Sequence, residues 1–419
     1  MHYGQLKKNA IVFNFDNFSK VFNNKFAAVI PNISIFAFGE TLHSAEEILQ
    51  IRNKIFQILV ENYGFTAVAM ECSFPHSKII NDYIHNNIDS TYQEIMDIGI
   101  NNGFGRLKAN QELIEWLKDY NSKKENFKKL NFYGFDIPGK NYGPAAPHFM
   151  IKQIFDYLKK YDAKIYKKYK DKISEYINSE EVWESYAALT DPTKAFGYTE
   201  QALKLQVEVK NIISEFKQKK FDFIAKSDKN QYSEILHLAN ILNEHIYYHT
   251  AIAQNAGYEF LLGYRDYLIS ENVNYIFNKE YERCATTKLF LFAHNAHLQK
   301  GKVYMPIGGK NCEWYPAGAY ISDIFKTKYC MCGSAIGYCE TYVETAPEIS
   351  TFEKLFLDWH IPNFILATDE MIKNTDFSEF KTRTYSDKNP SYKPLSTQAF
   401  YDFDYICFFD KVNKSIAIN

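Results

Sequence analysis

Several short motifs that define large enzyme classes are missing from this chain. It contains no GxSxG nucleophile elbow, no GxGxxG after a strand-like run, no HExxH and no GxxxxGK[ST]. The sequence therefore gives no support for a serine hydrolase, a dinucleotide-dependent enzyme, a zincin metalloprotease or a P-loop NTPase.

Long apolar runs and an excess of one charge are also missing. Nowhere do 18 uncharged apolar residues follow one another, and residues 1–14 lack a basic segment followed by an apolar core. Lys and Arg number 48 against 50 Asp and Glu, so the net charge is −2. The sequence predicts a soluble, cytoplasmic protein with no nucleic-acid or membrane partner, and a small neutral ligand fits it better than a polyanion.

Cysteine is scarce, with seven residues in 419. An odd number in a long chain argues against a disulfide framework and for reduced thiols. Cys330, Cys332 and Cys339 are close in sequence but lack the paired CxxC spacing of zinc sites, so we expect buried strand thiols there.

What the chain does contain is an alternation of short apolar runs with helical patterns. This rhythm is typical of βαβ units and predicts an α/β fold with a mostly parallel central sheet flanked by helices. Expected strands are 33–38, 65–70, 130–135, 288–293, 329–332, 364–367 and 405–409, and expected helices in the first third are 45–63, 78–86 and 107–120.

Between residues 148 and 281 the alternation stops and long helical patterns take over, including 202–224 and 232–257. We expect a large all-α insertion that forms a lid over the C-terminal strand edge, with residues 1–147 and 282–419 forming the α/β core. The segment 306–316 is expected to be a loop that can close over a site.

Candidate catalytic side chains follow the first two expected strands. Gly39-Glu40-Thr41-Leu42-His43 ends the first run, and Glu71 ends the next. Parallel strands place such ends in one crevice, where His43 can act as a general base and Glu40 can orient it. Glu71 can supply a second carboxylate, and the rival interpretation is a helix cap at His43 with a surface carboxylate at Glu71.

A later pair of histidines, His294 and His297, ends the strand-like run 288–293, and one of them can pack as a structural core histidine. Arg265 is a candidate to polarise a carbonyl or to hold an oxyanion, although a plain ion pair with Asp266 would explain it too. Arg52 is a weaker candidate for the same substrate contact.

Two other sets of residues have weaker signals. His245 and His249 have a ligand-compatible spacing without an apparent third ligand, and Cys72-Ser73 could offer a nucleophile without a neighbouring histidine.

Taken together, the motifs resemble those of the erythromycin esterase family. They are Gly39-Glu40-Thr41-Leu42-His43, Ala69-Met70-Glu71, Tyr133-Gly134-Phe135-Asp136, Arg265-Asp266 with Glu271-Asn272, and His294-Asn295-Ala296-His297.

The resemblance implies an α/β core with a helical insertion that hydrolyses an ester or macrolactone with water, without a covalent intermediate. It implies His43 as the base, Glu40 and Glu71 as its carboxylate partners, and His294 and Arg265 as carbonyl ligands supported by His297. Ser44 and the segments 72–75 and 103–109 depart from the family pattern, which affects the expected substrate more than the chemistry.

From these observations we expect a carboxylic ester hydrolase that acts on a small-molecule ester or lactone, with no cofactor and no bound metal. The alternatives are a metal-dependent hydrolase that uses the same histidines and glutamates, a tailoring enzyme that performs elimination or acyl transfer, and a protein that binds a small molecule without turnover.

Overall fold

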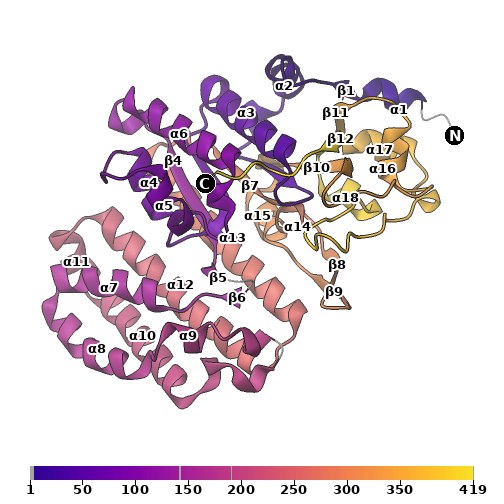
Figure 1. Ribbon diagram of the computed structural model, residues 1–419. Helices are drawn as coiled ribbons and strands as arrows, with labels where there is room; N and C mark the ends of the chain where they lie inside the picture. Colours follow the sequence, from indigo (N-terminus) through magenta and orange to yellow (C-terminus); the bar gives the residue numbers. More distant parts are fainter. Residues whose placement is uncertain (1–3, 141–142, 190, 419) are drawn as a thin grey trace.

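An eight-stranded sheet forms the centre of the protein, with strand order β1-β11-β12-β10-β2-β7-β3-β4 (Figure 1). The computed structural model describes residues 4–140, 143–189 and 191–418. Six neighbouring strands, from β12 to β4, run parallel, whereas β11 is antiparallel to β12 and β1 is antiparallel to β11. The predicted α/β fold with a mostly parallel central sheet is confirmed. The strands of this sheet are β1 (Ile11–Val12), β2 (Ile35–Glu40), β3 (Ala67–Ser73), β4 (Asn131–Asp136), β7 (Leu289–His294), β10 (Tyr329–Cys339), β11 (Asn363–Ala367) and β12 (Tyr405–Val412).

Both faces of the sheet are buried, which explains why its strands read as continuous apolar runs in the sequence. Successive side chains of a strand point to opposite faces. In β2, Phe36 and Phe38 belong to the core on one face, and Ile35 and Ala37 belong to the core on the other. The expected strands match the observed ones within a few residues, except that β10 extends seven residues beyond Cys332 and β1 gave no recognisable signal.

Helices cover each face of the sheet. One face packs against α2 (Phe18–Phe26), α3 (Glu46–Tyr63), α4 (Lys78–Ile84), α5 (Tyr92–Gly99) and α6 (Lys108–Ser122). The other packs against α13 (Tyr258–Arg283), α15 (Ala317–Phe325), α16 (Phe352–Leu357), α17 (Thr368–Asn374) and α18 (Thr397–Asp402). Short helices α1 (Gly4–Asn9) and α14 (Asn295–Leu298) complete this part.

A group of helices lies beyond the carboxyl ends of the strands, and the β4 arrow in Figure 1 points toward it. These helices have a hydrophobic core of their own. The long helix α13 contacts both β4 and α12, so it joins this group to the sheet. None of the helices in the described ranges is long and apolar enough to cross a membrane. The group comprises α7 (His148–Tyr161), α8 (Ala163–Tyr176), α9 (Glu180–Trp183), α10 (Glu200–Gln218), α11 (Lys220–Lys226) and α12 (Lys229–Ala253).

The segment 306–316 is not the loop that the sequence suggested. It is most of a hairpin formed by β8 (Val303–Ile307) and β9 (Lys310–Trp314), whose two turn residues, Gly308 and Gly309, have φ angles of 57° and 76°. Two consecutive positive φ angles favour a tight hairpin turn, because they match the twist of the paired strands. Elsewhere, β5 (Gly139–Lys140) pairs with β6 (Gly143–Pro144) in antiparallel orientation.

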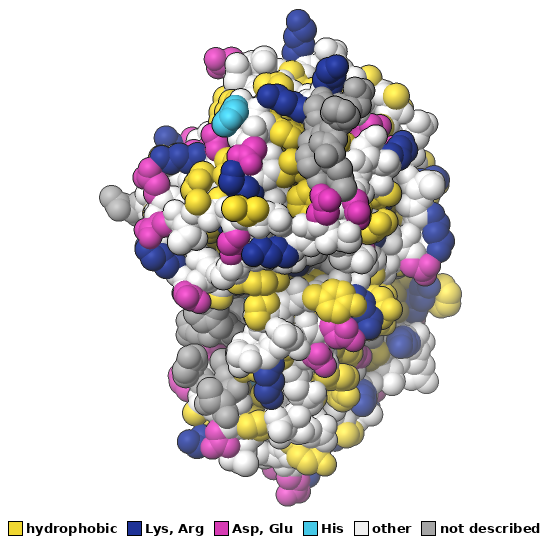
Figure 2. Space-filling view, turned by 90° about the vertical axis from the view of Figure 1, so that its right-hand side faces the viewer, with side chains coloured by type: hydrophobic (Ala, Val, Ile, Leu, Met, Phe, Trp, Pro, Cys, Tyr) yellow, Lys and Arg dark blue, Asp and Glu magenta, His cyan; other side chains and the backbone are white. Residues whose placement is uncertain are grey.

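The charge balance of the sequence is visible on the surface. On the face in Figure 2, Lys and Arg side chains alternate with Asp and Glu, and no broad area carries one sign. That face offers no field to attract a polyanion.

Candidate active site

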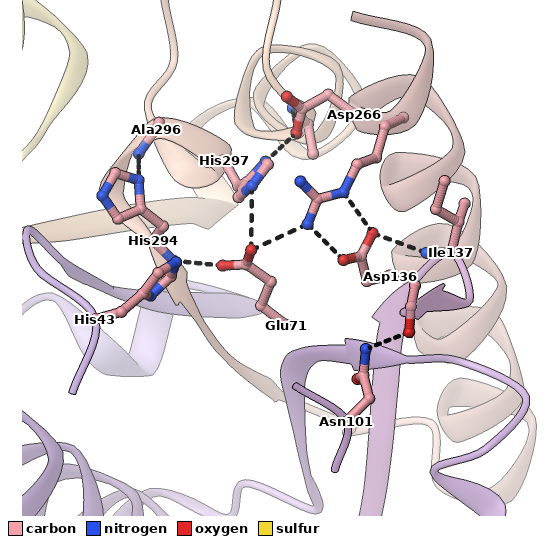
Figure 3. Close-up of polar contacts among 12 residues, drawn as sticks. His43, Glu71, Asn101, Asp136, Ile137, Asp266, His294, Ala296 and His297 are labelled. Atoms are coloured by element: carbon pink, nitrogen blue, oxygen red, sulfur yellow. Dashed lines mark hydrogen bonds and ion pairs between the residues drawn. The ribbon is translucent and has the colours of Figure 1, made fainter. Parts of the chain in front are cut away.

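Four polar side chains meet at the carboxyl ends of adjacent strands. Glu40 ends β2 and is paired in register with His294, which ends β7. Asp136 ends β4, and Glu71 lies in β3 where the register with β4 shifts between Met70 and Ser73. An irregularity of this kind re-aims a side chain. The crevice expected from the strand ends is therefore present, and Figure 3 shows Glu71 at its centre.

His43 and Glu40 form a base-and-carboxylate pair. Nδ1 of His43 lies 2.7 Å from Oε1 of Glu40, and because a carboxylate only accepts, Nδ1 carries the proton. Nε2 of His43 has no partner among the described residues and keeps its lone pair for a proton. Burial opposes charging of this ring, but the nearby carboxylates Glu40 and Glu71 outweigh it and raise the pKa of His43 above its ordinary value of 6.5.

His294 is held differently, with both ring nitrogens occupied. Nε2 donates to the backbone oxygen of Ser391 at 2.7 Å, and Nδ1 accepts from the backbone N–H of Ala296 at 3.2 Å. Burial and the neighbouring His43 lower the pKa of His294 to about 3, so this ring is neutral at physiological pH. Its ring centre lies 5.1 Å from that of His43, and in this arrangement it has no ring N–H left to donate to a carbonyl.

The Ser391 segment supports both histidines. The hydroxyl of Ser391 accepts the backbone N–H of His43 at 3.1 Å, while its backbone oxygen holds His294. Nothing in the sequence pointed to this residue, because its contacts join positions 348 and 97 residues apart.

Glu71 accepts hydrogen bonds from three donors. Oε1 lies 3.2 Å from Nε2 of His297 and 3.1 Å from Nη2 of Arg265, and Oε2 accepts the backbone N–H of His294 at 2.8 Å (Figure 3). Burial opposes ionisation of Glu71. The charges of His297, His43 and Arg265 outweigh burial, so the pKa of this carboxyl lies well below its ordinary value. Glu71 is thus a fixed anion that does not contact the ring of His43 directly.

His297 is a fixed cation between two carboxylates. Its Nδ1 donates to Asp266 at 2.6 Å, and Asp266, which is fully buried, also accepts from Trp314 Nε1 at 2.6 Å and from the backbone of Ala317 at 3.1 Å. Burial opposes the charge, but Asp266 and Glu71 raise the pKa of His297 to about 10. The β8–β9 hairpin is therefore anchored to α13 through the same carboxylate that holds His297.

Arg265 pairs with Asp136 and Glu71 rather than with its neighbour Asp266. Its Nε lies 2.9 Å from Asp136 Oδ1, and Nη2 lies 2.5 Å from Asp136 Oδ2. Nη1 has no partner among the described residues, and about a quarter of the side chain is exposed. Asp136 was named in the sequence only as part of a family motif and was given no role, although the rule that identified Glu71, an acidic residue at a strand end, applies to it as well.

Arg52 does not line the site, contrary to its expected substrate contact. It is fully buried behind the strand ends, where it donates to Asn53 at 2.9 Å and to Asn110 at 2.7 Å, and it lies 4.8 Å from the centre of the Phe292 ring. Burial lowers its pKa to about 10, and the charge of Glu40 opposes this shift. It therefore places a positive charge behind the Glu40–His43 pair.

A pocket opens beside His43. Its lining comes from the ends of β2, β3 and β7, from α3 and α6, and from the segment around the short helix η2 (Phe104–Arg106). The lining residues are Glu40, His43, Ser44, Leu49, Met70, Glu71, Ile100, Phe104, Leu107, Asn110, Phe292 and Ala293.

The weaker candidates have structural partners. Nε2 of His245 and Nε2 of His249 both donate to the backbone oxygen of Ala145, and within the described ranges no group of three or more His, Cys, Asp or Glu side chains is arranged to hold a metal ion. Ser73 does have a histidine beside it, since its hydroxyl lies 2.7 Å from Nδ1 of His76, but Ser73 is only 1% exposed.

The cysteines follow the expectation of buried strand thiols. Cys330, Cys332 and Cys339 all lie buried along β10.

Comparisons with known proteins show which family and which folds this chain is similar to. The family model described as erythromycin esterase matches residues 60–412, a region that begins after Glu40 and His43. Erythromycin esterase type II of Escherichia coli is 25% identical over 303 residues, which are 68% of this chain and 64% of that protein. The chain thus spans about two thirds of the length of this curated relative.

Solved structures share the fold over almost the whole chain. A Bacillus cereus protein has a TM-score of 0.74 at 16% identity, with 99% of this chain and 98% of that chain covered. A succinoglycan biosynthesis protein has a TM-score of 0.71 at 17% identity, with coverage of 98% and 97%. An erythromycin esterase mutant in its open conformation has a TM-score of 0.69 at 16% identity, with 96% of each chain covered.

Proposed function

The chain belongs to the erythromycin esterase family, and we propose that it hydrolyses a carboxylic ester of a small molecule, with a macrolide-type lactone as the first candidate substrate. The observation that carries this proposal is the Glu40–His43 pair, which leaves Nε2 of His43 free beside a pocket. An oriented imidazole with a raised pKa is suited to take a proton from water near neutral pH.

In the proposed reaction, Nε2 of His43 removes a proton from water while the oxygen of that water attacks the ester carbonyl carbon. Glu40 stabilises the imidazolium that forms, as a carboxylate does in hydrolytic triads. When the tetrahedral intermediate collapses, His43 returns the proton to the leaving alkoxide, so the products are the acid and the alcohol. No bond forms between substrate and protein.

The negative charge of the intermediate needs a donor, and Arg265 is the side chain we assign to it. Its Nε and Nη2 are held by Asp136 and Glu71, so the guanidinium is fixed while Nη1 remains available. A preorganised donor of this kind contributes about 10²–10³-fold to turnover.

The remaining histidines act as supports in this proposal. His294 packs against His43 as a neutral ring, and His297 keeps Glu71 ionised and in place. We further propose that the helical region 148–281 covers the carboxyl ends of the strands and forms the opposite wall of the substrate site, since α13 carries Arg265 and contacts β4.

Mass spectrometry of macrolide lactones and simpler esters incubated with the protein tests this function. We expect a gain of one water with wild type and none with His43→Ala. His148→Ala is the control, because His148 contacts the backbone of Asn178 outside the site. This variant should hydrolyse the substrates at the wild-type rate. Hydrolysis by His43→Ala at the wild-type rate would contradict the assigned base.

Two further measurements test the role of Arg265 and the need for a metal ion. Arg265→Lys keeps a positive charge but loses the planar set of guanidinium N–H donors, so we expect turnover to fall about 10²-fold or more. Hydrolysis should continue after exhaustive chelation, and a loss that added divalent metal restores would instead favour the metal-dependent alternative.

A further inference from the structure

The two histidines nearest the pocket differ in what their Nε2 atoms can do. Nε2 of His43 has no partner among the residues that the structure describes, whereas Nε2 of His294 donates to the backbone oxygen of Ser391 at 2.7 Å. The two ring centres lie only 5.1 Å apart, so their place in the fold does not by itself make one ring the base. Their hydrogen-bond partners distinguish them.

Ser391 lies in a tight turn, which we call the 389–392 turn. The backbone N–H of Tyr392 bonds to the backbone oxygen of Asn389 at 3.1 Å, and Asn389 is followed by Pro390, an order that β-turns favour. The side-chain oxygen of Asn389 accepts both the backbone N–H of Ser391 at 2.9 Å and its hydroxyl at 2.7 Å. Because the hydroxyl proton is directed to Asn389, the hydroxyl oxygen is left to accept the backbone N–H of His43 at 3.1 Å.

The chain just after the turn is anchored at Lys393, which is buried. Its backbone N–H donates to the backbone oxygen of Thr41 at 2.9 Å, and its backbone oxygen accepts the hydroxyl of Thr41. Its Nζ donates to Oε1 of Gln299 at 2.8 Å. Thr41 lies between Glu40 and His43 in the sequence, so these bonds hold the turn in place beside the proposed base.

From these contacts we infer that the 389–392 turn positions both histidines and leaves His43, not His294, to act as the base. Its hydroxyl holds the backbone of His43. Its backbone oxygen keeps a proton on Nε2 of His294, and Nδ1 of that ring is occupied by the backbone N–H of Ala296, so the ring has no lone pair for a proton from water. This role rests on the proposed function, and the residues of the turn are positioning residues because they act through the histidines.

Ser391→Ala removes the hydroxyl but leaves the backbone oxygen, so it tests the contact with His43 alone. One hydrogen bond that positions the base is lost, and we expect kcat to fall about three- to tenfold with KM unchanged. Ser391→Thr keeps the hydroxyl and should restore kcat. Ser322→Ala is the matched control, because it removes a half-buried hydroxyl that donates to the backbone oxygen of Ala319 in α15. A kcat that Ser391→Ala leaves unchanged, or that Ser391→Thr lowers equally, would contradict this contact.

Asn389→Ala removes the acceptor that holds the turn together, so it should affect both histidines. Two hydrogen bonds are lost, and we expect kcat to fall about tenfold or more. Asn14→Ala is the matched control next to the edge strand β1, since the side-chain oxygen of Asn14 accepts the backbone N–H groups of Asp16 and Asn17 at 3.0 and 2.9 Å. This control should keep the wild-type kcat, and the same result for Asn389→Ala would refute the role of the turn.

NMR of protein with ¹⁵N-labelled histidine reports the second contact without any substrate. The ring signals of His294, assigned by their loss in His294→Gln, should show a neutral ring protonated on Nε2 in wild type and in Ser391→Ala. In Asn389→Ala the Nε2 proton should exchange with water about tenfold faster, because its acceptor is displaced. A wild-type ring protonated on Nδ1, or an exchange rate that Asn389→Ala leaves unchanged, would overturn the inference.

The kinetic and NMR measurements also separate this role from the proposed function. If wild type hydrolyses no ester while the His294 ring behaves as expected, the proposed function fails and the turn still positions the two histidines. If wild type hydrolyses esters while Ser391→Ala and Asn389→Ala keep its kcat and its His294 exchange rate, the proposed function stands and the positioning role is refuted.

Discussion

Replacement of Glu40 by Gln probes the central pair of the site with a minimal change of shape. The amide oxygen can still accept from Nδ1 of His43, so the ring keeps its orientation, and what disappears is the negative charge. In the wild type this carboxylate lies 2.7 Å from Nδ1, and its side chain is 8% exposed. The variant therefore isolates the electrostatic stabilisation of the imidazolium that forms during proton transfer.

The size of this effect follows from Coulomb's law. Two unit charges about 4 Å apart at an effective dielectric constant of about 20 interact by about 4 kcal/mol. That energy corresponds to about a 10³-fold change in rate, and because charge on the imidazole is incomplete in the transition state, we expect kcat/KM to fall by about 10²–10³-fold.

The pH profile gives an independent readout of the same pair. The base acts when its ring is neutral, and the carboxylates raise the pKa of His43, so wild-type kcat/KM should fall as the pH drops through a value above 6.5. Glu40→Gln removes the strongest of the raising contributions, so this acidic limb should move to lower pH. Stopped assays with a good ester substrate between pH 5 and 9 measure both quantities.

Glu46→Gln provides the matched control. Glu46 is a buried carboxylate at the start of α3, where it accepts from Gln50 at 2.9 Å and from the backbone of Ile416 at 3.1 Å. This control should keep the rate and the acidic limb of the wild type. If Glu40→Gln also kept both, the assignment of Glu40 and His43 as a charge-stabilised pair would be refuted.

Two further predictions concern the charges around this pair. The pKa of His297 is raised to about 10, so the stability that its charge contributes is fully present below pH 6.5 and is lost as the pH rises through about 10. The free energy of unfolding, measured by denaturant titration, should therefore fall by on the order of 2–4 kcal/mol over that range. Asp266→Asn should be less stable than wild type at pH 7, and its stability should depend less on pH. Arg52→Met should lower the free energy of unfolding by about 1–3 kcal/mol, because it leaves the buried Asn110 oxygen without its donor and removes the positive charge behind Glu40. KM should stay unchanged, whereas a raised KM with normal stability would restore Arg52 as a substrate contact.

The sequence predicted the sheet well because its strands are buried on both faces. Such strands are continuous apolar runs, and the polar residues that end them, Glu40, Glu71 and His294, stand out against that background. The hairpin at 303–314 was missed for the opposite reason, since it is half exposed and its signal is a two-glycine turn that also occurs in loops. The helix expected over 202–224 is divided at Lys219, and no Gly or Pro in the sequence marks this break.

The site also has features that the sequence predicted and features that only the folded chain decided. The order of residues at strand ends was enough to predict that Glu40, Glu71 and His294 share one crevice, because parallel strands end at one edge of a sheet, although the same rule was not applied to Asp136. The state of each group was decided by tertiary contacts. Burial and the neighbouring His43 keep the His294 ring neutral, while Ser391, 97 residues further along the chain, fixes its orientation. Asp266 and Glu71 keep His297 a cation. Protonation depends on burial and on charges within a few ångströms, and neither quantity exists until the chain has folded.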